Sequence, residues 1–296
     1  MSAPARESRG SHAAPAPAPH LAEVPPVQEA GDPPGRYLLG MRVDATSYAD
    51  ATDRILSWAA AHESRYVTVA TVNNVMESYD DPSFRRIMDA SDLVTPDGVP
   101  LVWGLRALGV RRATRVYGPD LTSHVLRAAA QQGVPVGFYG GSQEVLDVLL
   151  QRVRVAFPDL RIVFGVAPPF RTLTAEEDEQ INRDIEASGA RIVFVGLGCP
   201  KQERWMSEHR PSVRAVMVGV GAAFDFLAGS KRQAPAVLQR MGLEWLFRLA
   251  TEPRRLWRRY LRHNPRFVVL FGRQVLRTKL RRALGSADDE EGNDRI

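Results

Sequence analysis

The sequence predicts an α/β protein with a parallel sheet and a basic, mostly helical C-terminal appendage. From Tyr66 onward, short apolar runs alternate with segments of helical pattern. Strands that alternate with helices form βαβ units, and these units build a parallel sheet. The segment after Trp245 is rich in arginine and in bulky apolar residues. That composition is typical of amphipathic helices and predicts the appendage.

The apolar runs place each strand, and the segments between them place the helices. The strands are expected at residues 66–70, 93–95, 134–139, 161–166, 191–195 and 215–220. The helices are expected at residues 73–80, 82–90, 99–108, 121–132, 143–156 and 174–188. Ser142 is expected to cap the helix that follows it, because a serine hydroxyl accepts a hydrogen bond from the first helical turn.

Composition divides the chain into four segments. The 296 residues are 44% hydrophobic and 25% charged, which suits a domain with a substantial core, placed at 37–245. Residues 1–36 are rich in Pro and Ala without an apolar period and are expected to be a disordered tail. Residues 246–284 form the basic appendage, and residues 285–296 are expected to be an acidic disordered tail. The single cysteine, Cys199, excludes an internal disulfide.

The appendage carries most of the positive charge. Between 246 and 284, twelve Lys and Arg residues accompany the single acid Glu252, a net charge of +11. Each Lys or Arg near an anionic leaflet contributes about 1 kcal/mol of attraction. Nucleic acid attracts the same charges, but the bulky apolar neighbours favour an anionic membrane surface as the partner. Because no signal-like start or apolar run of about 18 residues occurs, we expect a cytoplasmic protein, peripheral on the inner face of the cell membrane.

The octet GLGCPKQE at 196–203 follows the apolar run 192–195 directly. A strand that stops at Gly-x-Gly places Gln202 and its charged neighbours at the carboxyl end of a sheet, where open α/β sheets bind ligands. A solvated glycine-rich turn is the alternative interpretation. Two other predicted strands also end in glycines, at Gly140-Gly141 and at Gly219-x-Gly221. Such turns expose N–H groups that suit a diphosphate. None completes G-x-G-x-x-G, so we predict a Rossmann-like core without a dinucleotide signature.

Asp97 is the best candidate for an acid or base. It follows a short strand in the segment TPDGVPLVWG. If Val99 and Trp103 shield its carboxylate from water, its pKa rises and it can take a proton from an attacking hydroxyl. An Asp-Gly turn that only accepts backbone hydrogen bonds is the equal alternative. Thr71, Asn73 and Asn74 leave the preceding strand in the same way and offer uncharged groups that suit sugar hydroxyls or amides. Helix capping by Asn73 is the alternative.

The sequence gives little support for a metal or other cofactor. It has no Asp-x-Asp after a strand and no His pair at helical spacing, so we expect neither an essential metal ion nor a cofactor. Arginines, lysines and helix N-termini would then have to neutralise a bound diphosphate. Arg115, followed by VYGPD, is one candidate, and a solvated surface arginine is the alternative.

Taken in order, these motifs resemble the WecG/TagA/CpsF family of bacterial glycosyltransferases over residues 37–267. The matching pieces are Thr71-Val72-Asn73, DLVTPDG at 92–98, RVYGPD at 115–120, Gly140-Gly141, GLGCPKQE at 196–203, VGVGAAFDFLAG at 218–229, GLEWLFR at 242–248 and EPRR at 252–255. Arg232-Gln233-Ala234-Pro235 departs from the family's usual Arg-Ala-Pro by one residue, so Arg232 receives no role.

The resemblance implies an inverting, metal-independent transferase. Family members move a sugar, commonly N-acetylmannosamine or its uronic acid, from a UDP donor to a sugar on a polyprenyl-diphosphate carrier during cell-surface polymer synthesis. By the same resemblance Asp97 would be the general base on the acceptor hydroxyl, and Thr71 and Asn73 would line the pocket beside it.

The resemblance also assigns residues to the donor. Gln202 would contact the donor, and Arg115 would lie near the active site. Arg248, Arg254 and Arg255 would belong to a membrane-docking appendage and close over the diphosphate.

Two unrelated functions stay open on the sequence. A nucleotide-dependent Rossmann oxidoreductase would share the alternating pattern, but the complete glycine fingerprint and the acid about 20 residues beyond it are missing. A non-enzymatic nucleic-acid-binding protein would explain the basic appendage and leave Asp97 and the octet without a role. The sequence identifies neither the donor sugar, nor the lipid-linked acceptor, nor the oligomeric state.

Overall fold

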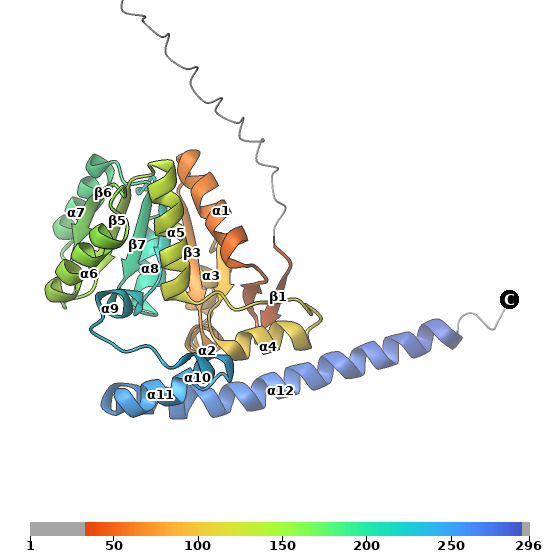
Figure 1. Ribbon diagram of the computed structural model, residues 1–296. Helices are drawn as coiled ribbons and strands as arrows, with labels where there is room; N and C mark the ends of the chain where they lie inside the picture. The colour runs from red at the N-terminus through yellow and green to blue at the C-terminus, as the bar shows by residue number, and fades with distance from the viewer. Residues whose placement is uncertain (1–32, 292–296) are drawn as a thin grey trace, which may run out of the picture. The chain divides into compact units, whose positions relative to one another are not determined.

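Figure 1 shows the computed structural model, which describes residues 33–291. Residues 1–32 and 292–296, and the side chains of residues 236, 240 and 281–291, lie outside the described part of the chain. Most of the predicted N-terminal tail and the end of the predicted acidic tail therefore lie outside the described residues.

The core is a six-stranded parallel sheet, as predicted. The strands lie in the order β4-β3-β8-β7-β5-β6, and every neighbouring pair is parallel. Their bounds are β3 (Arg65–Ala70), β4 (Leu93–Pro96), β5 (Val136–Gly140), β6 (Ile162–Val166), β7 (Ile192–Gly196) and β8 (Val216–Gly219). The six predicted strands are confirmed. Because β8 lies between β3 and β7, the turns that follow these three strands are neighbours.

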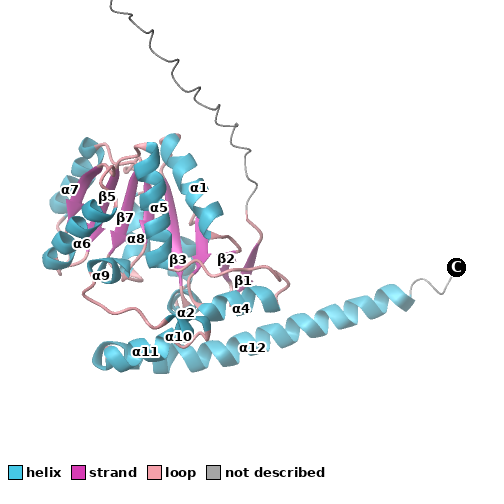
Figure 2. Cartoon of the chain, viewed as in Figure 1, coloured by secondary structure: helices cyan, strands magenta, loops and turns pink. Residues whose placement is uncertain are grey.

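Helices cover both faces of this sheet (Figure 2). Their bounds are α1 (Tyr48–Ala60), α2 (Val72–Asp80), α3 (Pro82–Asp89), α4 (Val99–Ala107), α5 (Gly118–Gln132), α6 (Gln143–Ala156), α7 (Ala175–Ser188), α8 (Lys201–His209) and α9 (Ala223–Ala228). The predicted helices are confirmed, and α5 starts three residues early because Pro119 fits a first helical turn. Ser142 caps α6, as predicted, by accepting a hydrogen bond from the Val145 N–H at 3.3 Å.

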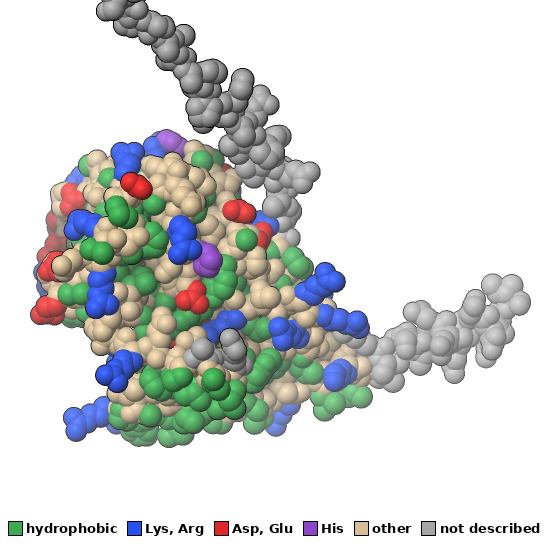
Figure 3. Space-filling view, viewed as in Figure 1, with side chains coloured by type: hydrophobic (Ala, Val, Ile, Leu, Met, Phe, Trp, Pro, Cys, Tyr) green, Lys and Arg blue, Asp and Glu red, His purple; other side chains and the backbone are tan. Residues whose placement is uncertain are grey.

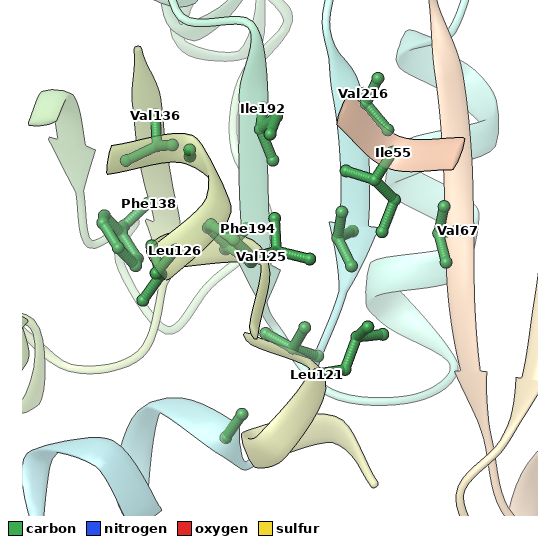
Figure 4. Packing of buried hydrophobic residues seen from close by; sticks show 14 of the residues in the cluster. Ile55, Val67, Leu121, Val125, Leu126, Val136, Phe138, Ile192, Phe194 and Val216 are labelled. Carbon is green, nitrogen blue, oxygen red and sulfur yellow. The ribbon is translucent and has the colours of Figure 1, made fainter. Parts of the chain in front are cut away.

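Alternate residues of each strand face opposite sides of the sheet, as the period of a strand requires. In β7, Ile192 and Phe194 pack in the cluster that includes α1, α5, α6 and α9. Val193 and Val195 belong to the cluster on the opposite face, which includes α7 and α8. Figure 4 shows Phe194 beside the α5 residue Val125, with Ile192 farther along the same strand. Burial on both faces explains why the strands read as continuous apolar runs.

The sequence did not predict the N-terminal hairpin. β1 (Gly35–Leu38) pairs antiparallel with β2 (Met41–Asp44), and Gly35 lies opposite Asp44. The carboxylate of Asp44 accepts a hydrogen bond from the Val94 N–H at 2.8 Å, which ties the hairpin to β4. Because of this pairing, the regular structure starts at Gly35 rather than at the predicted boundary of residue 37.

The C-terminal region is helical, as predicted. It consists of α10 (Ala236–Arg240), α11 (Glu244–Thr251) and α12 (Pro253–Glu291). Phe267 of α12 is buried with residues of the hairpin, α2, α3 and α4. Arg266 holds Asp80 of α2 with two hydrogen bonds, of 2.8 and 2.7 Å, so α12 packs on the core along α2. The helix reaches beyond the predicted appendage boundary at residue 284.

Within the described part of the chain, no helix combines the length and the apolar character that crossing a bilayer requires.

Candidate active site

Asp97, Thr71 and the octet lie at one edge of the sheet. Asp97 follows β4, Thr71 follows β3, and the octet GLGCPKQE joins β7 to α8. Parallel strands end at a common edge, which is where open α/β sheets bind ligands. The N–H groups of Asp97 and Gly98 both donate to the carbonyl oxygen of Ala70, at 3.0 and 3.4 Å. The turn that holds Asp97 therefore lies directly against the end of β3.

Asp97 is paired with Arg115. Nη2 of Arg115 donates to Asp97 Oδ1 at 3.0 Å and to Glu244 Oε2 at 2.6 Å, and Nε of Arg115 donates to the Asp97 carbonyl oxygen. The Arg115 guanidinium lies over the ring of Tyr117, 4.3 Å from its centroid. The structure thus brings Arg115 to the predicted base. Glu244, the first residue of α11, was not predicted as part of the site.

Burial raises the pKa of Asp97 from 3.8 to about 6. The charges of Arg115 and Arg248 lower this pKa, and the charge of Glu244 raises it. Trp103 is itself 54% exposed, and two of the charges that act on Asp97 come from α11. A carboxylate whose pKa lies near the working pH is suited to general base catalysis.

Thr71 and Asn73 lie at the start of α2. The Thr71 hydroxyl accepts a hydrogen bond from the Asn73 N–H at 3.2 Å, and the Asn74 side chain accepts one from the Thr71 N–H at 3.0 Å. Thr71 and Asn74 therefore cap this helix. Asn73 Nδ2 donates to Cys199 Sγ at 3.3 Å, whereas Asn73 Oδ1 is buried without a hydrogen-bond partner among the described residues. That oxygen is a candidate acceptor for a ligand hydroxyl.

Glu203 is buried beneath the site and was not predicted as a site residue. Its Oε1 accepts hydrogen bonds from Asn74 Nδ2 and from Gln202 Nε2, both at 3.0 Å. Burial raises the pKa of Glu203. The octet therefore does not present a solvated face at this position, because Glu203 joins the ends of β3 and β7 from within. Its place in the octet after a buried strand was the one sequence signal, and that signal does not distinguish a buried acid from a solvated one.

Gln202 forms part of the floor between β7 and β8. Its side chain is buried, and its Oε1 accepts a hydrogen bond from the Gly198 N–H at 3.2 Å. A Cβ atom on Gly219 would lie 3.2 Å from Gln202 Nε2. The glycine that ends β8 thus leaves room for Gln202.

Of the three predicted appendage arginines, the structure brings Arg248 to the site. Its guanidinium lies 5.6 Å from the ring centroid of Phe226, and its charge acts on Asp97. Arg254 and Arg255 are exposed at the start of α12, and Arg255 pairs with Glu252 at 2.5 Å. Within residues 33–280, neither Arg254 nor Arg255 forms an ion pair with Asp97.

A cleft of about 340 Å³ opens beside Arg115 and Tyr117. Its lining combines apolar side chains of α4, including Trp103, with polar groups. Two of these, Tyr48 and Asp120, share a hydrogen bond of 3.2 Å. An aromatic side chain among a few polar groups is suited to binding a sugar.

The described residues contain no group of three or more His, Cys, Asp or Glu side chains placed to hold a metal ion.

Comparison with known proteins identifies the family of this chain. The model of the glycosyl transferase WecG/TagA/CpsF family matches residues 36–282, a range that includes Asp97, Arg115, the octet and α11. A protein of Bacillus spizizenii strain W23, named N-acetylglucosaminyldiphosphoundecaprenol N-acetyl-beta-D-mannosaminyltransferase, is 31% identical over 209 residues. That similarity covers 70% of this chain and 79% of the relative. The chain belongs to the glycosyl transferase WecG/TagA/CpsF family.

Proposed function

We propose that the protein is an inverting transferase that moves an N-acetylmannosamine-type sugar, or its uronic acid, from a UDP donor to a sugar on polyprenyl diphosphate during cell-envelope polysaccharide synthesis. Family membership supports sugar transfer, and the name of the Bacillus relative supports both the sugar and the lipid-linked acceptor. The observation that carries the proposal is the Asp97 carboxylate, buried at the ligand-binding edge of the sheet and paired with Arg115. An oxidoreductase or a nucleic-acid-binding protein would leave this arrangement without a role.

Inversion by single displacement requires one base and a stabilised leaving group. The Asp97 carboxylate takes the proton of the acceptor hydroxyl while that oxygen bonds to the anomeric carbon of the donor sugar. The bond from this carbon to the diphosphate oxygen breaks, and UDP leaves with the electron pair. Arg115 and Arg248 hold the negative charge that develops on the diphosphate, so the scheme requires no metal ion.

The other predicted residues have supporting roles in this scheme. Thr71 fixes the first turn of α2, and Asn73 Oδ1 accepts a hydrogen bond from a sugar hydroxyl. Gln202 contacts the donor from the floor of the site. Arg254 and Arg255, exposed at the start of α12, approach the diphosphate only when the donor is bound.

The C-terminal helices offer a surface for the membrane that holds the acceptor. We define the apolar docking surface as the exposed apolar residues of these helices, namely Val237, Met241, Trp245, Leu246, Trp257, Leu261, Val268, Val269, Leu276 and Leu280. Figure 3 shows hydrophobic side chains gathered at the lower edge of the molecule, over α11 and α12, with basic side chains around them. Apolar residues bordered by Lys and Arg bind an anionic bilayer surface. This surface supports the proposal that the protein acts at the inner face of the cell membrane.

A UDP-release assay tests the proposed function. The intact protein receives a panel of UDP-sugars and a short-chain polyprenyl-diphosphate-GlcNAc acceptor, and D97N is assayed in parallel. Acceptor-dependent release with one donor, lost in D97N, is the expected result. Normal turnover by D97N would refute the assignment of the base. Co-sedimentation with anionic vesicles, compared with binding to duplex DNA, tests the membrane partner against nucleic acid.

A further inference from the structure

Glu244 joins the C-terminal region to the proposed base through a single nitrogen atom. Nη2 of Arg115 donates both to Asp97 Oδ1 at 3.0 Å and to Glu244 Oε2 at 2.6 Å. The side chains of Asp97, Arg115 and Glu244 are 16%, 20% and 14% exposed, so the solvent screens these three charges weakly. Glu244 lies 129 residues beyond Arg115 in the sequence, at the first position of α11.

These contacts hold the Arg115 guanidinium in one orientation. Its Nε donates to the Asp97 carbonyl oxygen, its plane lies over Tyr117, and Glu244 accepts the shorter of the two Nη2 bonds. An arginine that faced Asp97 alone could donate two parallel hydrogen bonds to that carboxylate. Glu244 opposes such pairing because it draws Nη2 toward α11.

The charged and titratable groups that face Asp97 come from two segments. Arg115 and Tyr117 lie on the segment before α5, and Glu244 and Arg248 lie on α11. Burial and Glu244 raise the pKa of Asp97, whereas Arg115 and Arg248 lower it. Burial, Glu244 and Asp97 all raise the pKa of Tyr117, so its hydroxyl stays neutral. α11 therefore supplies one charge of each sign to the surroundings of the base.

We propose that Glu244 is a positioning residue that limits the pairing of Arg115 with Asp97. Asp97 thereby stays a strong enough base to accept the proton of the acceptor hydroxyl. The inference rests on the proposed function, in which Asp97 is the base. It adds that the strength of this base depends on the position of α11.

This dependence links the chemistry to membrane docking. Trp245 and Leu246 follow Glu244 directly and belong to the apolar docking surface. If α11 leaves the core, Glu244 and Arg248 leave Asp97 together, and Arg115 then pairs with Asp97 alone. This change gives Asp97 the undivided contact of Arg115, and it removes the Glu244 charge that raises the Asp97 pKa together with the Arg248 charge that lowers it.

The pH profile of kcat/KM tests the role of Glu244. With the short-chain acceptor, the wild-type protein should lose activity below an apparent pKa near 6. In E244Q the acid limb should move to lower pH by about one unit, because the Asp97 carboxylate gains the whole charge of Arg115. The plateau should fall roughly threefold to tenfold, because the base is weaker. E244D keeps the charge and should keep the limb at the wild-type pH.

E252Q is the matched control. Glu252 lies at the junction of α11 and α12 and pairs with Lys231 and Arg255, at 3.5 and 2.5 Å, rather than with Arg115. Loss of this carboxylate should leave the acid limb in place. A limb that stays at the wild-type pH in E244Q, or that shifts equally in E252Q, would overturn the inference.

D97N separates a failure of this inference from a failure of the proposed function. If D97N keeps its turnover, Asp97 is not the base and the proposed function fails. If D97N is inactive and E244Q has the wild-type profile, only the role of Glu244 fails. Should E244Q not fold, E244M supplies a second uncharged side chain of similar length, with the same shift expected.

A second measurement does not depend on activity. The melting temperature of D97N minus that of the wild type, measured at pH 8, reports how unfavourable the Asp97 charge is in the folded protein. The melting temperature of the double variant D97N/E244Q minus that of E244Q should be a smaller difference, because Glu244 no longer repels the Asp97 charge. An equal difference in both backgrounds would also overturn the inference.

Discussion

Asn74 and Glu203 share a buried hydrogen bond of 3.0 Å although 129 residues separate them in the sequence. Asn74 also caps α2 from within its first turn, next to Asn73, and Glu203 also accepts a hydrogen bond from Gln202. One buried carboxylate therefore fixes the segments that follow β3 and β7 relative to each other. The positions of the proposed sugar-binding groups depend on the Glu203 carboxylate, although this carboxylate does not itself contact the ligand.

Glu203→Ala is expected to destabilise the fold. The substitution removes the acceptor for Asn74 and Gln202, and each buried donor left unpaired costs about 1–3 kcal/mol. Urea unfolding at pH 8 measures the change in the free energy of unfolding. Glu208→Ala, at an exposed position of the same helix, is the matched control and should change it by less than about 0.5 kcal/mol.

Glu203→Gln should behave differently, since it keeps an acceptor oxygen and removes a charge. Burial raises the pKa of Glu203, so the folded state holds its proton to higher pH than the unfolded state does, and ionisation at higher pH costs stability. At pH 8 this variant should therefore be at least as stable as the wild type. A large loss of stability would mean that the ionised carboxylate, rather than its acceptor oxygens, holds the two segments.

Asp97→Asn should abolish turnover and stabilise the protein at pH 8. The pKa of Asp97 is raised from 3.8 to about 6, so between these values the folded state binds more protons than the unfolded state. The free energy of unfolding therefore falls as the pH rises through this window, by on the order of 3 kcal/mol. Because asparagine does not ionise, Asp97→Asn does not lose this free energy of unfolding as the pH rises. Unfolding of both proteins at pH 4 and pH 8 checks this, and an asparagine variant that is less stable at pH 8 would contradict it.

The sheet could be predicted from the sequence because each strand is buried on both faces. A strand such as β7 then reads as an unbroken apolar run that ends at glycine. The hairpin could not be predicted in this way, because β1 and β2 are short and their hydrogen bonds to the core, such as that from Val94 to Asp44, join residues that are far apart in the sequence. Nor does alternation of strands and helices specify that β8 lies between β3 and β7.

The site could be predicted in part. Asp97 and Thr71 follow predicted strands directly, so the parallel sheet alone implies that they share an edge. Glu244 lies on a helix that the sequence describes only as amphipathic, and its contact with Arg115 depends on how α11 returns to the core. Glu203 looks like an ordinary solvated acid until its bond to Asn74 is known. Long-range contacts of this kind leave no local pattern.

Chelation should not stop the reaction. Arg115 and Arg248 lie beside Asp97 and supply positive charge where the diphosphate is proposed to leave. Turnover measured in excess EDTA should match turnover in its absence. Loss of activity that magnesium or manganese restores would contradict the proposed neutralisation of the diphosphate by arginines.

Leu261→Glu combined with Val268→Glu should release the protein from membranes. Both residues are exposed on α12 and belong to the apolar docking surface. Replacing their apolar side chains by acids removes buried area at the interface and adds repulsion from anionic lipid, so co-sedimentation with anionic vesicles should weaken at least about tenfold. Val155→Glu, on the exposed face of α6, makes the same change of chemistry away from this surface and should bind vesicles normally. Turnover of the short-chain acceptor without vesicles should persist in the double variant, because neither side chain lies in the folded core. Equal vesicle binding by the double variant and by Val155→Glu would show that the C-terminal apolar residues do not carry the interaction.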